Sequence, residues 1–180
     1  MTRSGIALLL LLPAAACTPG ARASPPAGPA PAPDPYEACG SREDAEVCAA
    51  EVERAALARS GGRARRSGGR LEIAAAGGRV IPLANDTTEG ERYVRYRYRE
   101  YLEEIGYHLV EVGFYEGGGF VLVSAATGDE THLHGSPVVS PDRARFVAVS
   151  VDLVAGYDPN GIQVWRLTGA GPRLEWGVDG

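Results

Sequence analysis

The sequence of 180 residues contains no lysine, so all eighteen of its basic residues are arginine. It also lacks a long apolar run, because the longest, residues 6–12, is far short of the roughly 20 residues that a membrane-spanning helix needs. No serine stands in a Gly-x-Ser-x-Gly elbow, and Gly117-Gly118-Gly119 is followed by neither lysine nor a helix, as a phosphate loop would require. The net charge of −5 provides no basic footprint, which argues against nucleic acid as a partner.

Residues 1–16 have the form of a bacterial export signal. Arg3 supplies the positive charge that precedes the apolar run, Pro13 ends that run, and small residues follow it, as at a cleavage site. Removal of this segment takes away one arginine and no acidic residue. The exported chain is therefore expected to be slightly more acidic than the whole sequence.

The end of the signal carries a resemblance to a known family. Pro13-Ala14-Ala15-Ala16-Cys17 resembles the lipobox of bacterial lipoproteins, in which the cysteine becomes the acylated first residue. Ala14 stands where that family usually has leucine. The resemblance implies a protein of the periplasm or cell envelope that is anchored to a membrane through Cys17. Plain cleavage at 14–16 or at 21–23 would instead give a soluble secreted protein.

The three cysteines agree with an exported location. Cys39 and Cys48 are close in sequence and are expected to form a disulfide, because an exported protein meets an oxidising environment. Two unbridged thiols are the alternative. Cys17 is then left without a partner, and lipid modification explains an odd cysteine in an exported chain.

The next two segments connect the signal to a domain. Residues 17–35 contain seven prolines and predict an extended spacer. Within 36–70, a helix is expected to begin at Ser41, with Asp44 completing a capping box, and to end at Ser60-Gly61-Gly62. Its weakly apolar stripe consists of Ala45, Cys48, Ala49, Val52 and Ala56. The Gly- and Arg-rich remainder, 60–70, predicts a mobile loop.

From residue 71 the period changes to that of strands, which predicts an antiparallel β domain over 71–180. The expected strands are 71–73, 80–83, 93–102, 107–115, 120–125, 130–134, 137–140, 145–151, 162–167 and 173–176. The predicted fold class is mainly β: a meander of hairpins, propeller-blade-like or a small sandwich, with one N-terminal helix. Between 93 and 102, Val94, Tyr96 and Tyr98 share one face and three arginines share the other.

Residues 107–176 also resemble blades of WD40-like propeller repeats. The resemblance rests on Ser136-Pro137-Val138-Val139-Ser140-Pro141-Asp142, then 145–150, then 162–167. Arg143 departs from the repeat, which usually has glycine after Ser-Pro-Asp. Propellers typically need four or more blades, so the resemblance implies either a small stack of sheets or a chain shorter than its full gene product.

The strongest metal candidates are His132 and His134, which lie two apart in a strand and so point to one face. Asp129 is near in sequence, and His108 is expected on an adjacent strand. Two imidazoles and a carboxylate are ligands that transition metals accept. An ordinary solvent-facing turn explains the same residues, and no metal is assigned.

Three further groups of residues were weighed against simpler explanations. Asp152 and 158–161 offer oxygen ligands for calcium but lack EF-hand spacing, and a turn accounts for them. The Tyr/Arg strand, 92–101, offers a surface for an anionic polymer or an acidic protein, although strand packing accounts for it too. Glu103, Glu104, Glu111 and Glu116 contain no pair of fixed separation, as glycoside hydrolysis would need.

The sequence therefore predicts no catalytic residue and no cofactor. The expected function is that of a lipid-anchored envelope protein whose β domain binds another envelope component. The alternatives are a metal-dependent module that uses His132 and His134, and an incomplete propeller with no ligand of its own. The expected partners are the membrane, through the anchor, and an envelope protein or anionic polymer.

Overall fold

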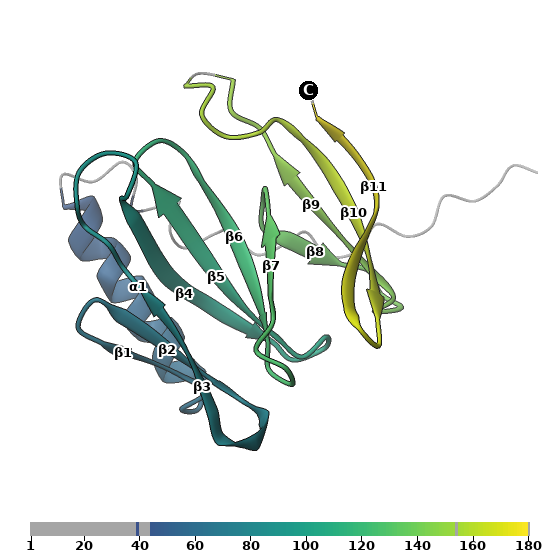
Figure 1. Ribbon diagram of the computed structural model, residues 1–180, viewed down its shortest axis with the longest axis horizontal. Coiled ribbons are helices and arrows are strands. Elements are labelled where there is room, and N and C mark those ends of the chain that lie inside the picture. Colours follow the sequence, from purple (N-terminus) through teal and green to yellow (C-terminus); the bar gives the residue numbers. More distant parts are fainter. Residues whose placement is uncertain (1–38, 40–43, 154, 180) are drawn as a thin grey trace, which may run out of the picture. The chain divides into compact units, whose positions relative to one another are not determined.

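The structure is a computed structural model that describes residue 39 and residues 44–153 and 155–179 (Figure 1). The predicted signal, the spacer, Cys17 and Ser41 lie outside these residues. The described elements are α1 (Ala45–Arg59), β1 (Ala64–Ser67), β2 (Arg70–Ala75), a 3-10 turn (Ala76–Gly78), β3 (Arg79–Ala84), β4 (Val94–Leu102), β5 (Tyr107–Phe114), β6 (Gly118–Ser124), β7 (Glu130–Leu133), β8 (Pro137–Val139), β9 (Arg145–Ser150), β10 (Gly161–Thr168) and β11 (Gly171–Asp179).

The strands form three antiparallel sheets, each a meander of neighbours in sequence. Sheet A contains β1 to β3, sheet B contains β4 to β7, and sheet C contains β8 to β11 (Figure 1). The prediction of a mainly β, antiparallel meander with one helix is confirmed. The ten predicted strands correspond to β2 to β11, with each end within three residues of the observed one, whereas β1 was not predicted.

Sheet B has apolar side chains on both faces, and each face belongs to a separate core. On β5, Val110 and Val112 point to a core shared with sheet A and α1, which includes Leu71 and Ile73. The neighbouring Leu109 belongs to the second core, shared with sheet C. Because successive side chains of a strand point to opposite faces, the continuous apolar sequence of this strand fits burial on both sides.

The second core is completed by the inward-facing side chains of sheet C. It joins Leu102, Leu109, Leu122 and Leu133 of sheet B to Phe146 and Ala148 of β9, with Trp165 packed beside them. The rings of Phe146 and Trp165 are stacked with their centroids 6.0 Å apart. Gly135, in the link between the two sheets, passes so close to β9 that a Cβ atom there would collide with the carbonyl oxygen of Val149.

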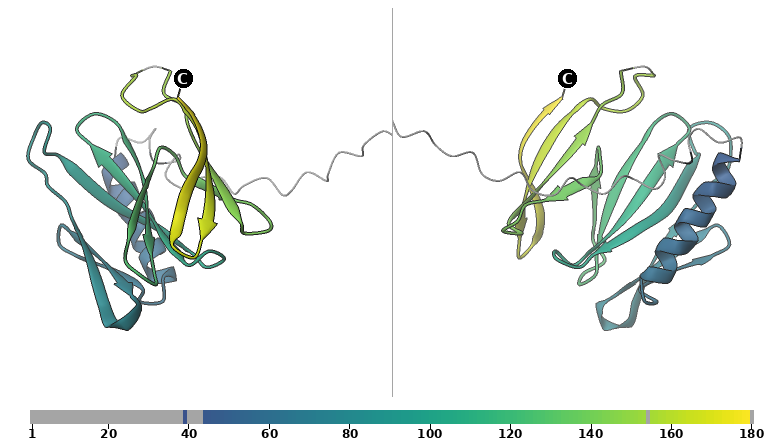
Figure 2. Two further views of the ribbon diagram at one scale, coloured as in Figure 1. Left: turned by 45° about the vertical axis from the view of Figure 1, so that its right-hand side comes forward. Right: turned by 180° about the vertical axis from the view of Figure 1, so that it is seen from behind.

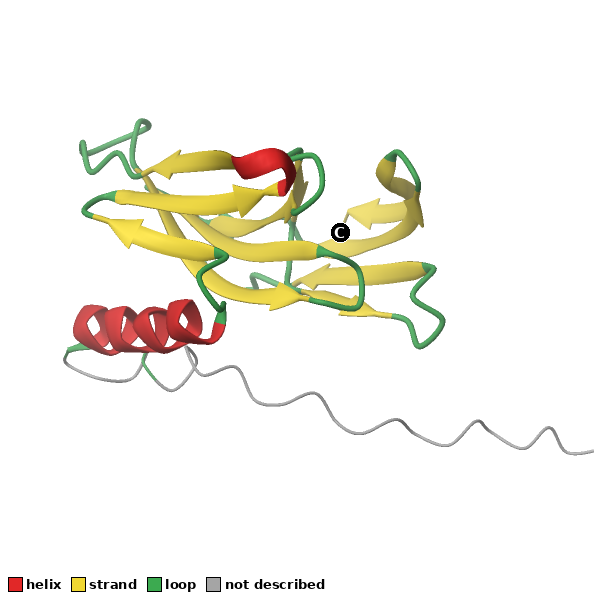
Figure 3. Cartoon of the chain, turned by 90° about the horizontal axis from the view of Figure 1, so that it is seen from below, coloured by secondary structure: helices red, strands yellow, loops and turns green. Residues whose placement is uncertain are grey.

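Helix α1 runs beside β4 (Figures 2 and 3), and it ends before Ser60-Gly61-Gly62, as predicted. Its buried side chains are Cys48, Ala49 and Ala56, all from the predicted stripe. Asp44 occupies the N-cap position without a side-chain capping bond. Within the described part of the chain, no helix combines the length and apolar character needed to cross a membrane.

The prediction of a mobile loop over 60–70 is wrong, because residues 64–67 form β1. Ala64 is buried in the first core, and the Arg66 guanidinium pairs with Glu53 of the helix while donating to the carbonyl oxygen of Tyr96. Gly68, with φ of +57°, supplies the tight turn into β2. The Gly- and Arg-rich composition gave no signal for a strand, because β1 is held in place by its contacts with Glu53, Tyr96 and the first core rather than by apolar side chains of its own.

The predicted disulfide is present, and the Sγ atoms of Cys39 and Cys48 are 2.04 Å apart. It closes a loop of short sequence separation and fastens Cys39 to the first turns of α1. In the chain-entropy model, a loop of this size contributes about 2–3 kcal/mol by restricting the unfolded chain.

Arg143 occupies a glycine-like position in the turn between β8 and β9. Its φ of +57° lies in the left-handed region, and it is the one non-glycine residue with positive φ among those described. The turn is held by Ser140 and Asp142, whose side-chain oxygens accept hydrogen bonds from the N–H groups of Arg145 and Ala144. The WD40-like repeats usually have glycine at this place, and the backbone here has the conformation that glycine favours.

We predict that Arg143→Gly raises the free energy of unfolding by about 0.5–1 kcal/mol, because the left-handed penalty of a side chain exceeds the extra freedom that glycine gives the unfolded chain. Urea denaturation measures the change. Arg143→Ala is the matched control and should show no such gain, since alanine keeps the Cβ atom. A glycine variant no more stable than the alanine variant would contradict the assignment.

Candidate functional site

The outer face of sheet C, which points away from sheet B, is apolar and uncovered within the described part of the chain. We call it the open face; it consists of Val138, Val147, Val149, Ile162, Val164, Trp176 and Val178. The strand register fixes its membership, because the alternate residues Val139, Phe146, Ala148 and Trp165 belong to the second core. Two rows cross the sheet, Val138-Val147-Val164-Trp176 and Val149-Ile162-Val178.

Several large apolar side chains of the open face are strongly exposed to solvent. Val138 is 58% exposed, Trp176 is 54% exposed and Val149 is 49% exposed. The loop between β9 and β10 adds Leu153, which is 85% exposed. Large contiguous apolar patches are rare on monomeric proteins and mark sites of interaction when they occur.

A charged cluster borders the open face. The Glu175 carboxylate accepts a hydrogen bond of 2.6 Å from Arg145 and pairs with Arg166 on the neighbouring strand. These two hydrogen bonds hold the pKa of Glu175 below its ordinary value. The bulge in the register beside Trp165 lets Glu175 and Trp176 lie on the same side of the sheet. The acidic charge is thus neutralised beside the apolar rows.

The outer face of sheet A has the opposite character. Its outward residues are Arg65, Arg70, Glu72, Ala74, Val80 and Pro82, and Arg65 pairs with Glu72 across the strands at 2.6 Å. The alternation on β2 is clean, with Leu71 and Ile73 fully buried between exposed or half-exposed neighbours. Sheet A is therefore built to face water, whereas sheet C has apolar residues on both faces.

The free backbone edge of β4 is covered by polar side chains. The Glu53 carboxylate accepts a hydrogen bond from the Tyr98 N–H at 2.8 Å, and Asn85 accepts one from the Tyr96 N–H at 2.9 Å. Arg66 donates to the Tyr96 carbonyl oxygen on the same edge. These contacts block the addition of a further strand at this side of sheet B.

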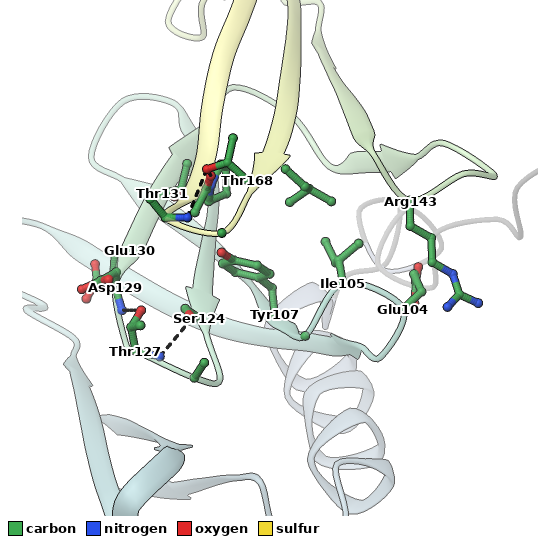
Figure 4. A pocket seen from close by; sticks show the side chains of 17 residues that line it. Glu104, Ile105, Tyr107, Ser124, Thr127, Asp129, Glu130, Thr131, Arg143 and Thr168 are labelled. Carbon is green, nitrogen blue, oxygen red and sulfur yellow. Dashed lines mark hydrogen bonds between the residues drawn. The ribbon is translucent and has the colours of Figure 1, made fainter.

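A cavity of about 580 Å³ lies between one end of sheet B and the β10–β11 hairpin (Figure 4). The Tyr107 ring projects into it, and Ser124, Thr127, Asp129 and Thr168 line it (Figure 4). Burial raises the pKa of Tyr107, and the nearby Asp129 charge raises it further, against a hydrogen bond with Ser124 that lowers it. The polar side chains that line this cavity are mainly hydroxyl groups and carboxylates, and such a lining suits a polar ligand.

The two candidate histidines line a second, smaller cavity of about 300 Å³, together with Glu116 and Asp158. His132 is solvent-exposed, whereas the Nδ1 atom of His134 is buried without a hydrogen-bond partner in the described structure. Asp129, the third predicted ligand, lines the first cavity instead. Among the described residues, no group of three or more His, Cys, Asp or Glu is placed to hold a metal ion.

The expectation that His108 lies on a strand adjacent to the other histidines is wrong, because β6 separates β5 from β7. His108 is fully buried, and its Nδ1 atom is 3.2 Å from the Tyr98 hydroxyl. The Tyr101 ring lies 4.8 Å from the imidazole, and Arg63 lies over that ring. Burial lowers the pKa of His108 to about 4, assisted by the Arg63 charge and opposed by the Ala74 carbonyl group.

The arginines of β4 are engaged by acidic side chains. Arg95 and Arg97 pair with Glu46 of α1, and Arg99 donates to Glu111 at 2.8 Å. Partial burial raises the pKa of Glu46, but Arg97 and Arg95 outweigh it and hold that pKa below its ordinary value. All three arginines of β4 are therefore engaged, by two carboxylates, and this is evidence against the Tyr/Arg strand as a surface for an anionic polymer.

The candidate calcium loop is held by its own backbone. The Asp152 carboxylate accepts hydrogen bonds from the N–H groups of Asp158, Tyr157 and Ala155, and these hold its pKa well below the ordinary range. Asp158 accepts a hydrogen bond from the Gly118 N–H. The oxygen atoms that calcium would need serve the turn.

The predicted carboxylates are also dispersed. Glu104 lines the first cavity, Glu116 lines the second, and Glu111 pairs with Arg99.

The open face was not among the sites predicted from sequence. Its signal was present in β9, because residues 146–149 are apolar at both parities, the pattern of a strand that is covered on both sides.

No family model, curated protein or solved structure matches this chain.

We predict that the domain loses stability as the pH falls from about 6.5 towards 4. The unfolded chain protonates His108 below its ordinary pKa of about 6.5, whereas the folded protein keeps this imidazole neutral down to about 4. At pH 5 the loss should be about 2 kcal/mol relative to pH 7.5. Chemical denaturation at the two pH values measures it.

His108→Asn keeps a hydrogen-bonding group near Tyr98 but does not titrate, so it should remove most of this pH dependence. His132→Asn is the matched control on an exposed histidine and should keep it. Equal stability of the wild-type protein at both pH values would contradict the assignment.

Proposed function

We propose that this chain is a non-enzymatic, lipid-anchored protein of the bacterial cell envelope whose β domain binds a protein partner through the open face. The observation that carries the proposal is the contrast between the two terminal sheets. The outer face of sheet A is polar, with an Arg65–Glu72 ion pair, while the outer face of sheet C exposes valine, isoleucine and tryptophan.

The energetics favour a partner on the open face. Burial of apolar surface contributes about 25 cal/mol per Å², and the exposed side chains of this face lie contiguously in two rows. The face is built on regular strands, whose side chains are already fixed by the second core beneath them. Binding therefore requires little ordering of the protein, which lowers its entropic cost.

The proposed address rests on the N-terminal sequence and the disulfide. The Cys39–Cys48 bond supports an oxidising compartment, and the lipobox-like residues 13–17 support acylation of Cys17. Residues 17–35, with seven prolines, would act as a spacer that reaches roughly 55 Å if fully extended as polyproline II. Such a spacer would hold the domain clear of the membrane while leaving the open face accessible.

A second candidate is a propeller-type sheet stack that needs a further sheet. The arrangement of β4–β7 and β8–β11 as successive four-stranded meanders with a shared core favours it. In that case the open face would be covered by a sheet from additional sequence, and a longer open reading frame would support it. The metal-dependent module is a weaker candidate, since the structure brings only His132 and His134 of its predicted ligands into one cavity.

We predict that cells expressing the chain incorporate labelled palmitate into it and that the protein sediments with membranes. Cys17→Ala should abolish both labelling and sedimentation, because it removes the acylation site. Ala21→Val alters a rival cleavage site and serves as the control that should keep both. A Cys17→Ala protein that still sediments with membranes would refute the anchor.

We also predict that a photo-crosslinking residue at Val149 gives adducts in the cell envelope, whereas the same residue at Val80 does not. The two positions are matched, since Val149 is 49% exposed on sheet C and Val80 is 50% exposed on the outer face of sheet A. Gel mobility and mass spectrometry identify the adducts. Equal adduct formation at both positions would remove the open face as the binding surface.

A further inference from the structure

We infer that the partner of the open face is a second copy of this chain, with the two open faces packed against each other about a two-fold axis. This inference rests on the proposed binding role of the open face and names its occupant. Two antiparallel sheets pack well face to face when both faces are apolar. A two-fold axis allows one face to serve both partners, because each copy presents the same surface.

The difference between the terminal sheets determines where such an assembly stops. The outer face of sheet A is not uniformly apolar, because Arg65, Arg70 and Glu72 point outwards beside Ala74, Val80 and Pro82. Head-to-tail stacking would bury these charges without new partners, which is costly. Face-to-face packing instead leaves the two polar faces of sheet A at the ends of a six-sheet stack, so the assembly closes at two copies.

The size of the open face is sufficient for a dimer. Its five most exposed side chains are between 38% and 58% exposed, and they are Val138, Val149, Ile162, Trp176 and Val178. With the two half-buried valines, this corresponds to on the order of 500 Å² per copy, or about 1,000 Å² for a pair, which is the lower bound for a specific interface. Leu153 and Val151, in the adjoining loop, are also exposed, and their area is not included in this estimate.

The charges on the face allow two copies to meet. Glu175 is paired with both Arg145 and Arg166, and Arg173 lies opposite Arg166 on the same side of the sheet, so each copy carries an excess of two positive charges at one end of its face. The side chains of Arg145 and Arg166 are 44% and 49% exposed. Salt screens charges of this kind beyond about 8 Å under physiological conditions. No unpaired acid lies among the seven apolar residues of the face.

Edge-to-edge pairing of sheet C is the competing mode of self-association, and the structure disfavours it. Sheet C has two edge strands, β8 and β11. Strand β8 has only three residues and begins with Pro137, and β11 carries Pro172 near its start and the charged Arg173; proline donates no backbone hydrogen bond. The register of β10 with β11 is also interrupted between Val164 and Trp165. Proline, charge and bulges are the devices by which edge strands avoid pairing. The two apolar rows of the open face contain neither proline nor a charged residue.

Analytical ultracentrifugation of the full-length protein in mild detergent tests the inference. We expect twice the mass of one chain at concentrations of about 100 µM, in keeping with a modest interface. Val149→Glu should weaken the dimer at least about a hundredfold, because it places a charge in a buried apolar interface. Val80→Glu, the matched substitution on sheet A, should leave the dimer unchanged. Val178→Glu replaces Val149→Glu if circular dichroism shows that the latter fails to fold.

The outcomes separate this inference from the proposed function. A wild-type protein that is monomeric at every concentration, or a dimer that survives Val149→Glu and Val178→Glu, would overturn self-association through the open face. If the protein is monomeric but a crosslinker at Val149 still joins it to a different envelope protein, the binding role stands and only the identity of the partner is wrong. If neither a dimer nor an adduct forms, both proposals fail.

Discussion

Burial of sheet B on both of its faces is the constraint on which the rest of the structure depends. Strands β5 and β6 have apolar side chains at both parities, so sheet A with α1 must cover one face and sheet C the other. Sheets A and C each have a second, outer face, and an apolar outer face must in turn be covered. Sheet A satisfies it by alternation, with leucine and isoleucine inwards and charged residues outwards. Sheet C does not, because its strands are apolar on both sides, and its outer face is left exposed.

Polar contacts determine which surfaces of the stack are closed. Glu53, Arg66 and Asn85 cover the edge of β4 with ion pairs and hydrogen bonds. Glu46 and Glu111 engage the three arginines of β4. Charged residues thus lie along the edge of β4 and on the outer face of sheet A. The two apolar rows of the open face contain no charged residue.

Much of the fold was predictable from the sequence, because period-2 alternation and glycine turns are local signals. The neighbouring strands over 71–73 and 80–83 and the disulfide between Cys39 and Cys48 were predicted correctly. Strand β1 was missed, since its order comes from Glu53 and the first core rather than from its own composition. The site was harder to predict: separate cavities hold Asp129 and the histidines, and only three-dimensional register distinguishes the inner from the outer face of sheet C.

Burial of the open face by a second copy of the chain would remove Trp176 from water, so Trp176 reports on the proposed dimer directly. The sequence has two tryptophans, and Trp165 packs against the second core while Trp176 is 54% exposed. Acrylamide quenching of tryptophan fluorescence should decrease as the protein concentration rises, with a blue shift of the emission, because Trp176 leaves water when the faces meet. Quenching and emission that stay constant over the whole concentration range would contradict the account.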